Sequence, residues 1–363
     1  MPRTDAPRSS QSLFEPVRVG AFTLDNRIAM APLTRNRAGP GLVPGPFAAE
    51  YYRQRASAGL IVSEATSVTP LGVGYADTPG IWNEAQVEGW KLTTRAVHDA
   101  GGLIFLQLWH VGRISDPHFL DGQAPVSASA IAAKGEVSLL RPKRPFPTPR
   151  ALTLEEIPDV IEAYRQGAEN AKRAGFDGVE LHGANGYLLD QFLQDGSNKR
   201  TDAYGGAIPN RARLMLEAVD AAISVFGPAR VGLHLAPRGD AHDMGDSNLS
   251  ATFDYVARAM KDRGIAFLMA RERLGDDSIG VALRAAFGGP FIANEGFDLA
   301  SAQALLAADK ADAVGFGKLF ISNPDLVARF AAGAPLNPWK VETFYSPGPE
   351  GYVDYPALES VEA

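Results

Sequence analysis

The stretch FDGVELHGANGYLLDQFLQDGSNKRTDAYGG, Phe176 to Gly206, decides the fold. It begins as a strand in which apolar Val179 and Leu181 face one side while Glu180 and His182 face the other, because side chains alternate along a strand. A glycine ends the strand, and after an Asn-Gly turn apolar residues recur at helical spacing. The stretch therefore predicts one strand–turn–helix unit with polar side chains at the carboxyl end of its strand.

The same unit recurs along the chain. The predicted strands are residues 27–34, 59–66, 102–110, 176–182, 229–236, 264–272, 290–295 and 311–318. Most are continuous apolar runs, which are typical of parallel strands buried on both faces, and most precede a helix. Eight such units predict an α/β fold, a (β/α)8 TIM barrel. An open doubly wound sheet is the alternative, but no G-x-G-x-x-G follows the first strand.

Capping signals predict where several helices begin. Asn83 with Gln86, and Thr153 with Glu156, have the spacing of capping boxes. Asp298 is a predicted cap, and Asn323 followed by proline is another.

The segments outside the repeat have separate expected roles within a single domain, residues 1–363. Residues 1–12 are polar and expected to be flexible, and residues 13–26 predict a hairpin that caps one end of the barrel. Residues 111–152, after the third strand, form a loop long enough to be a lid over a binding site. Residues 335–363 are a proline- and tyrosine-rich C-terminal tail.

Composition excludes several classes of function. The net charge of −7 and the pI near 5.5 argue against nucleic acid or an anionic membrane as partner. The chain has no cysteine, which excludes thiol nucleophiles, disulfides and cysteine-ligated clusters. With no apolar run of about 18 residues and no apolar leader segment, a cytoplasmic monomer or homodimer is expected.

Polar residues gather at the carboxyl ends of the predicted strands, where the active sites of TIM barrels lie. These ends carry Thr34, Glu64 with Ala65, Gln107 with Trp109, His182, His234, Glu272, Asn294 and Lys318. Beyond the fourth strand, His182 and Asn185 can donate hydrogen bonds to an oxygen, and Tyr187 can supply a proton. This combination predicts a site that polarises a carbonyl and protonates a carbon.

The last two strands end in glycine-containing loops, Asn294–Gly296 and Gly315–Lys318. Loops at these positions commonly hold a phosphate, and Lys318 offers a positive charge. The Gln107 amide can pair with the donor–acceptor edge of a pyrimidine-like ring. A flavin lying across the barrel mouth fits these features.

From about Leu13 to Tyr355 the sequence resembles the old yellow enzymes, a family of FMN-dependent ene-reductases. The resemblance lies in MAPLTRNRA (Met30–Ala38), SEAT (Ser63–Thr66), GYADTPGIW (Gly74–Trp82), QLWHVGRIS (Gln107–Ser115), HGANGYLLDQFLQDGSNKRTDAYGG (His182–Gly206) and NPDLVARF (Asn323–Phe330). It implies that NAD(P)H reduces bound FMN, which then gives a hydride to the β-carbon of an activated alkene. The implied substrates are α,β-unsaturated carbonyl compounds, maleimides and nitroalkenes.

The resemblance also implies a role for individual residues. His182 and Asn185 would hold the substrate oxygen, and Tyr187 would protonate the α-carbon. Implied cofactor contacts are Pro32, Leu33, Thr34, Ala65, Gln107, His234, Asn294, Gly296, Gly317 and Lys318, and further substrate contacts are Tyr75, Trp109, His242 and Tyr352. The family usually has arginine at the positions of His234 and Lys318, and relatives often have glutamine where this chain has His242.

Two other classes of function are compatible with the pattern. His182, His234 and Glu272 end neighbouring strands, so they can be ligands of one cation in a metal-dependent hydrolase or lyase. Alternatively, the barrel binds a flavin or a partner without catalysing a reaction.

Overall fold

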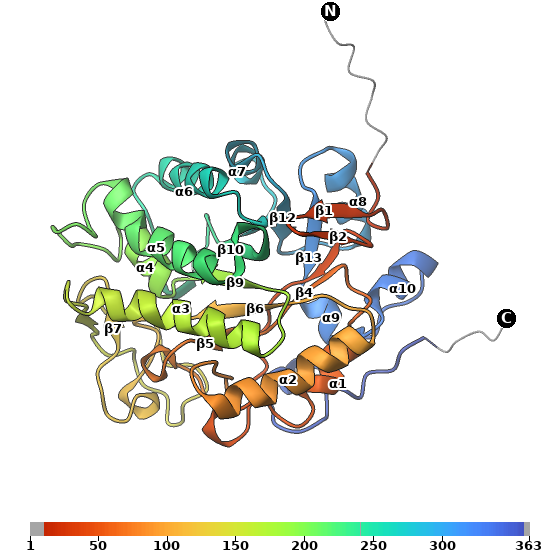
Figure 1. The fold of residues 1–363 in the computed structure, drawn as a ribbon, viewed down its shortest axis with the longest axis horizontal. Helices are drawn as coiled ribbons and strands as arrows, with labels where there is room; N and C mark the ends of the chain where they lie inside the picture. Colours follow the sequence, from red (N-terminus) through yellow and green to blue (C-terminus); the bar gives the residue numbers. More distant parts are fainter. Residues whose placement is uncertain (1–10, 240, 359–363) are drawn as a thin grey trace, which may run out of the picture.

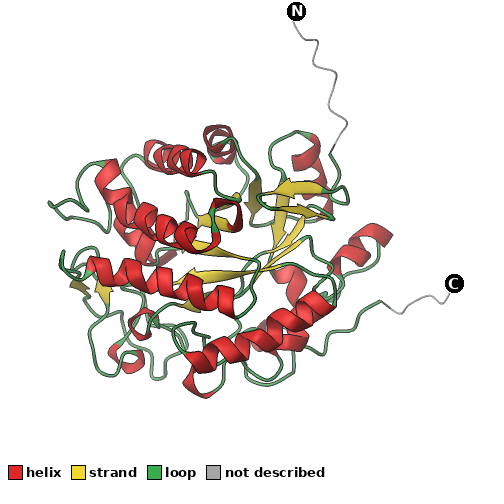
Figure 2. Ribbon diagram, viewed as in Figure 1, coloured by secondary structure: helices red, strands yellow, loops and turns green. Residues whose placement is uncertain are grey.

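The computed structural model describes residues 11–239 and 241–358, and within them a parallel barrel closes on itself (Figures 1 and 2). Its strands are β3 Ile28–Met30, β4 Leu60–Val62, β6 Ile104–Trp109, β9 Gly178–Gly183, β10 Val231–Leu235, β11 Phe267–Arg271, β12 Phe291–Asn294 and β13 Ala313–Phe316. The order runs β4-β3-β13-β12-β11-β10-β9-β6, and a β4–β6 pairing completes the ring. The short strand β5 (Thr66–Ser67), after β4 in the chain, pairs with the end of β6. The predicted (β/α)8 barrel is confirmed.

Helices follow the strands and surround the barrel. They are α1 Ala48–Arg53, α2 Glu84–Asp99, α3 Ile157–Arg173, α4 Leu188–Leu193, α5 Ile208–Phe226, α6 Leu249–Arg263, α7 Gly280–Phe287, α8 Leu299–Ala307, α9 Lys318–Ser322 and α10 Leu326–Ala332. Short 3₁₀ turns occupy Pro40–Leu42, Pro70–Gly72, Pro117–Phe119, Pro228–Arg230, Ala241–Asp243 and Val341–Thr343. None of the helices in the described ranges is both long and apolar enough to cross a membrane.

Two of the four predicted helix caps are confirmed. Asn83 forms the capping box of α2, and Asp298 caps α8. The predictions for Thr153 and Asn323 are wrong. Helix α3 begins after Glu156, whose carboxylate accepts from the Thr153 backbone and from an arginine. Asn323 follows α9, and α10 begins three residues later.

An apolar hairpin covers the amino end of the barrel. Strands β1 (Val17–Val19) and β2 (Phe22–Leu24) pair antiparallel, within the residues 13–26 expected to form a hairpin. Gly20 turns with a φ of 53°, and a Cβ there would lie 2.2 Å from the Ala229 carbonyl oxygen, so the hairpin fits tightly under β10. Its inward residues join an apolar cluster inside the barrel: Val19, Leu24, Ala29, Leu60, Val62, Phe105, Ala266, Phe267, Met269, Ile292 and Ala313.

The loop after β6 and the C-terminal tail pack near the carboxyl end. Residues 111–152, drawn around the β7 label in Figure 1, contain β7 (Val126–Ser127) and β8 (Arg150–Ala151) and a separate apolar cluster that includes Trp109. Arg37 donates to the carbonyls of Thr343 and Glu350, each at 2.9 Å, which ties the tail to the loop after β3. The expectations for residues 1–10 and 359–363 lie outside the described residues.

Candidate active site

A cavity of about 950 Å³ opens at the carboxyl end of the barrel. This size is within the usual range for ligand pockets. All eight barrel strands or the loops after them contribute to its wall. Of the predicted site residues it is lined by Pro32, Leu33, Thr34, Ala65, Gln107, Trp109, His182, Asn185, Tyr187, His234, Asn294, Gly296, Gly317 and Lys318.

The turn after β9 gathers the three predicted catalytic side chains. Asn185 has a φ of 59° and Gly186 a φ of 76°, and asparagine and glycine adopt this left-handed region most readily. A Cβ on Gly186 would lie 2.7 Å from the Met244 side chain, so only glycine fits there. The turn brings Tyr187 back over the end of the strand, and its ring centroid lies 4.9 Å from that of His182.

His182 is held neutral. Burial, followed by the neighbouring His234 ring, lowers the pKa of His182 well below its usual value. Its Nδ1 is buried and has no hydrogen-bond partner in the described part of the chain. A neutral imidazole keeps one N–H donor, so this residue has hydrogen-bonding capacity left for a ligand.

Tyr187 keeps its proton and is connected to a second phenol. Burial raises the pKa of Tyr187 to about 12, so the phenol is protonated at neutral pH. Its hydroxyl lies 2.9 Å from that of Tyr75, whose ring stacks on Trp109 with 5.5 Å between centroids. The Tyr75 hydroxyl is also 3.5 Å from His242 Nε2.

A second cavity of about 460 Å³ lies beside the first. Tyr75 and His242 line this second cavity, together with residues 136–139 of the lid. Thr34, Tyr187 and Tyr345 line both cavities. The structure therefore separates the predicted substrate contacts into two adjoining spaces that meet at Tyr187.

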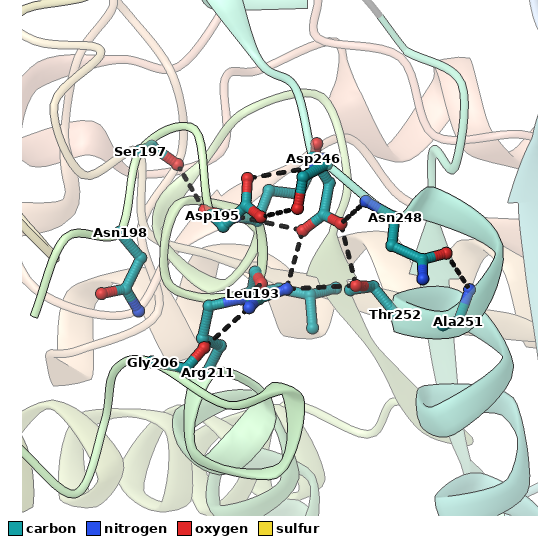
Figure 3. Close-up of polar contacts among 12 residues, drawn as sticks. Leu193, Asp195, Ser197, Asn198, Gly206, Arg211, Asp246, Asn248, Ala251 and Thr252 are labelled. Carbon is teal, nitrogen blue, oxygen red and sulfur yellow. Dashed lines mark hydrogen bonds and ion pairs between the residues drawn. The ribbon is translucent and has the colours of Figure 1, made fainter.

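The loop that carries His242 is anchored on the opposite side by a buried ion pair (Figure 3). Arg211 of α5 donates to Asp246 at 2.9 Å, and the Asp246 side chain is fully buried. The same carboxylate accepts from the Thr252 hydroxyl at 3.0 Å. With the loop held in this way, His242 Nδ1–H donates to the Asn185 carbonyl at 2.6 Å.

The prediction that Tyr352 contacts the substrate is wrong. Tyr352 is only 1% exposed, stacks on Tyr51 with 4.1 Å between centroids, and lies under the Arg37 guanidinium. It belongs to a buried arginine–tyrosine cluster that holds the tail. Tyr345, seven residues earlier in the same tail, is the tyrosine that reaches the cavities.

The opposite wall of the larger cavity has the polar groups that a flavin ring requires. Gln107 donates to Glu180 at 2.7 Å, while the other oxygen of the buried Glu180 has no partner among the described residues. The His234 ring lies between them and Asn294, with Nδ1 3.6 Å from the Glu180 carboxylate and Nε2 3.5 Å from the Asn294 amide.

The two glycine-containing loops leave their backbone accessible to a phosphate. A Cβ on Gly317 would lie 3.3 Å from Leu33, while one on Gly296 would point into open space. Lys318 is exposed at the same end of the cavity. The polar side chains of Gln107, His234 and Asn294, together with open backbone beside a lysine, fit FMN.

Glu272 does not face the cavity. Its carboxylate accepts from the backbone N–H groups of Ile279 and Gly280, at 2.9 and 2.8 Å, and from Arg238 at 2.7 Å. It therefore does not meet His182 and His234, and the described residues contain no cluster of three acidic or histidine side chains suited to a metal. The metal-dependent alternative is not supported.

Sequence reasoning missed two residues of this site, Arg271 and Tyr345. Arg271 ends β11 and lines the cavity, where the sequence pattern had placed its neighbour Glu272. A charged side chain at the end of a barrel strand indicates a site residue. Arg271 and Glu272 are both charged and adjacent there, so the sequence could not show which of them faces the cavity. The only sequence signal that Tyr345 is a site residue was its position in a tyrosine-rich tail.

Comparisons with known proteins agree in pointing to one family. The sequence profile of the NADH:flavin oxidoreductase / NADH oxidase family matches residues 12–337. The chain is 42% identical to 12-oxophytodienoate reductase 2 of Arabidopsis thaliana over 97% of both chains. The structure resembles an old yellow enzyme homologue from Zymomonas mobilis (TM-score 0.93, 46% identity, covering 96% of this chain and 100% of the other). It also resembles morphinone reductase in complex with tetrahydroNAD (TM-score 0.94, 48% identity, covering 97% and 99%).

Proposed function

Because the chain belongs to the NADH:flavin oxidoreductase / NADH oxidase family, the old yellow enzymes, we propose a specific role for each side chain at its barrel mouth. The protein is an FMN-dependent ene-reductase that uses NAD(P)H. The observation that carries the proposal is that two neutral hydrogen-bond donors and a protonated phenol meet in the cavity that fits a flavin.

The substrate oxygen is bound by His182 and Asn185. Both side chains can donate without being charged, and negative charge develops on this oxygen as hydride arrives at the β-carbon. Donors aimed at the position where charge develops stabilise the transition state more than the ground state. This arrangement suits α,β-unsaturated carbonyl compounds, maleimides and nitroalkenes. When bound, FMN supplies the hydride, which it has received from NAD(P)H.

Tyr187 completes the reaction as the acid. Its proton passes to the α-carbon of the substrate. The hydroxyl of Tyr75 at 2.9 Å then returns a proton to Tyr187, and Tyr75 regains one from solvent in the second cavity, which it lines.

The cofactor is held along the opposite wall. Pro32, Leu33, Thr34 and Ala65 contact the ring, Gln107 and His234 contact its pyrimidine edge, and Asn294, Gly296, Gly317 and Lys318 hold the phosphate end. Trp109, Tyr75 and His242 bound the substrate space. Three features stay predictions: a single domain over residues 1–363, a cytoplasmic location, and a monomer or homodimer.

Substituting the oxygen-binding pair tests the proposal. His182→Ala or Asn185→Ala is expected to slow reduction of cyclohexenone by about 10²–10³-fold, the usual loss for one such donor. His118→Ala, at an exposed histidine of the lid, is the matched control and keeps the wild-type rate. Heat should release FMN from all of these proteins. A flavin that NAD(P)H bleaches but no alkene reoxidises would contradict the proposed activity.

A further inference from the structure

Arg271 has no role in the site as proposed so far, yet it stands next to the substrate-binding turn. It is the last residue of β11, paired in register with Asn294 of β12, and it lines the larger cavity. Its side chain is 37% exposed. Within the described structure its guanidinium makes two side-chain contacts, to Asn185 and Glu295.

The contact with Asn185 determines how that amide is oriented. Arg271 Nη1 donates to Asn185 Oδ1 at 2.8 Å. A guanidinium has only donors, so the amide oxygen must face it and the amide NH₂ must face away. None of the hydrogen bonds in the described part of the chain uses this NH₂ group, which leaves both of its donors for a ligand in the cavity.

The guanidinium is itself fixed in place. Its Nη2 donates to Glu295 Oε1 at 3.0 Å, in the loop between β12 and α8. The two Nη atoms of the guanidinium thus connect the turn after β9 with the loop that also carries Gly296.

We propose that Arg271 is a positioning residue, which holds the Asn185 amide with its NH₂ toward the substrate oxygen. The inference rests on the proposed binding of that oxygen by His182 and Asn185. With no arginine, the amide can turn by 180° and present its own oxygen to the substrate oxygen. Two acceptors would then face each other at the point where negative charge develops.

The positive charge of Arg271 also shifts the pKa values of three side chains of the site, His182, Tyr187 and His242. Burial raises the pKa of Tyr187 to about 12, and the Arg271 charge opposes this rise. Burial lowers the pKa values of His182 and His242, and Arg271 lowers both further. The guanidinium therefore favours a neutral His182 and eases proton release from Tyr187, in addition to orienting Asn185.

The test uses FMN-loaded enzyme that has been reduced with dithionite and is then mixed with cyclohexenone without oxygen. Arg271→Gln is expected to slow flavin reoxidation by about 10- to 100-fold, as misplacement of a catalytic group does. Arg271→Lys keeps the positive charge but lacks the planar guanidinium that contacts Asn185 and Glu295 together, so it should recover part of the rate. The matched control is Arg273→Gln. Arg273 also lines the larger cavity, has an 83% exposed side chain and approaches the same Glu295 at 3.6 Å. Its loss changes the net charge equally, but none of its hydrogen bonds or ion pairs in the described structure reaches Asn185, so the rate should stay within about twofold of wild type.

A double-mutant cycle separates positioning from a general structural defect. If Arg271 acts mainly through Asn185, Arg271→Gln should slow the Asn185→Ala enzyme much less than it slows the wild type, with only the effect of its charge on His182 and Tyr187 remaining. Additive losses in the double variant would overturn the inference. Affinity for cyclohexanone, a carbonyl ligand that cannot be reduced by the flavin, should fall in Arg271→Gln and not in Arg273→Gln.

The outcomes also distinguish this inference from the proposed function. A slow Asn185→Ala together with a fast Arg271→Gln would overturn the positioning role alone. A fast Asn185→Ala would contradict the oxygen-binding site itself, and the positioning role with it.

Discussion

The two ends of this barrel differ in how their buried groups are satisfied. At the amino end, the hairpin and the lower strands form an apolar cluster around Phe267 and Phe105. At the carboxyl end, buried polar atoms of Glu180, His182 and Trp109 have no partner in the described part of the chain. A buried polar group without a partner costs about 1–3 kcal/mol. Of these three residues, His182 and Trp109 line the larger cavity, where a ligand can supply the missing contact.

This contrast implies that stability and chemistry can be altered separately. Substitutions at the amino end should change the free energy of unfolding and leave the reaction steps intact. Substitutions at the carboxyl end should do the reverse, because the groups there contact the ligands more than one another.

The largest difference between an effect on the reaction and an effect on stability is expected from Tyr187→Phe, which keeps the ring and removes the hydroxyl proton. Cyclohexenone reduction should fall by about 10²–10⁴-fold, the range for loss of a general acid. Reduction of the flavin by NAD(P)H and the melting temperature should stay near wild type. Nitroalkenes should be affected less, because their nitronate can be protonated by solvent. Stopped-flow measurement of each half-reaction checks this, and equal losses in both would indicate a packing defect.

At the amino end, Phe267→Ala should lower the free energy of unfolding by about 3–5 kcal/mol. Phe267 is fully buried, and its ring lies 5.8 Å from that of Phe105. Leu92→Ala, at a residue 61% exposed, is the control with little effect. Urea unfolding measures the difference. The FMN-bound variant should keep the wild-type rate of enone reduction below its transition, and a specific loss of that rate would show that the two ends are coupled.

Lys318→Ala should weaken the binding of FMN by about tenfold, since one charged contact to a phosphate is lost. Enzyme molecules that retain the cofactor should react at the normal rate. Dialysis followed by flavin absorbance measures retention, with Lys310→Ala, an exposed lysine before β13, as control. Unchanged retention in Lys318→Ala would place the phosphate elsewhere.

The last prediction is a loss of stability as the pH rises, and it belongs to the carboxyl end. Burial raises the pKa of Glu64 from 4.5 to about 7 and that of Asp190 from 3.8 to about 7. The folded state therefore binds more protons than the unfolded state between pH 4 and 7, so the free energy of unfolding falls as the pH rises through about 7. The expected change is on the order of 3 kcal/mol per group.

Unfolding of the wild type and of Glu64→Gln across pH 5–8 measures this effect. Glutamine cannot titrate, so the variant should lose part of the pH dependence. Equal slopes in the two proteins would mean that Glu64 ionises normally.

Most of the architecture could be predicted from the sequence because it depends on local patterns. Continuous apolar runs identify buried strands, and the Asn185–Gly186 pair readily adopts the two left-handed conformations that the turn after β9 uses. The grouping of His182, Asn185 and Tyr187 in the cavity follows from that turn alone.

The errors occurred where a residue's role depends on distant contacts. Local spacing favoured Thr153 and Asn323 as caps, but both helices start later. The Glu156 carboxylate also accepts from Arg150, and the Asn323 amide oxygen accepts from the Asn337 backbone N–H. The choice between Arg271 and Glu272 depends on the direction of the last residues of β11, and Glu272 turns toward the N–H groups before α7.

The sequence by itself determined the barrel, the family and the residues of the turn after β9, because each rests on neighbours within a few positions. Only the tertiary structure decided which tyrosine of the tail reaches the cavity and which cation orients Asn185. Arg37 holds the tail across more than 300 positions, at the Thr343 carbonyl. Arg271 reaches Asn185 across 86 positions. Contacts of that separation leave no periodic signal, since they arise only when the closed barrel brings the ends of its strands together.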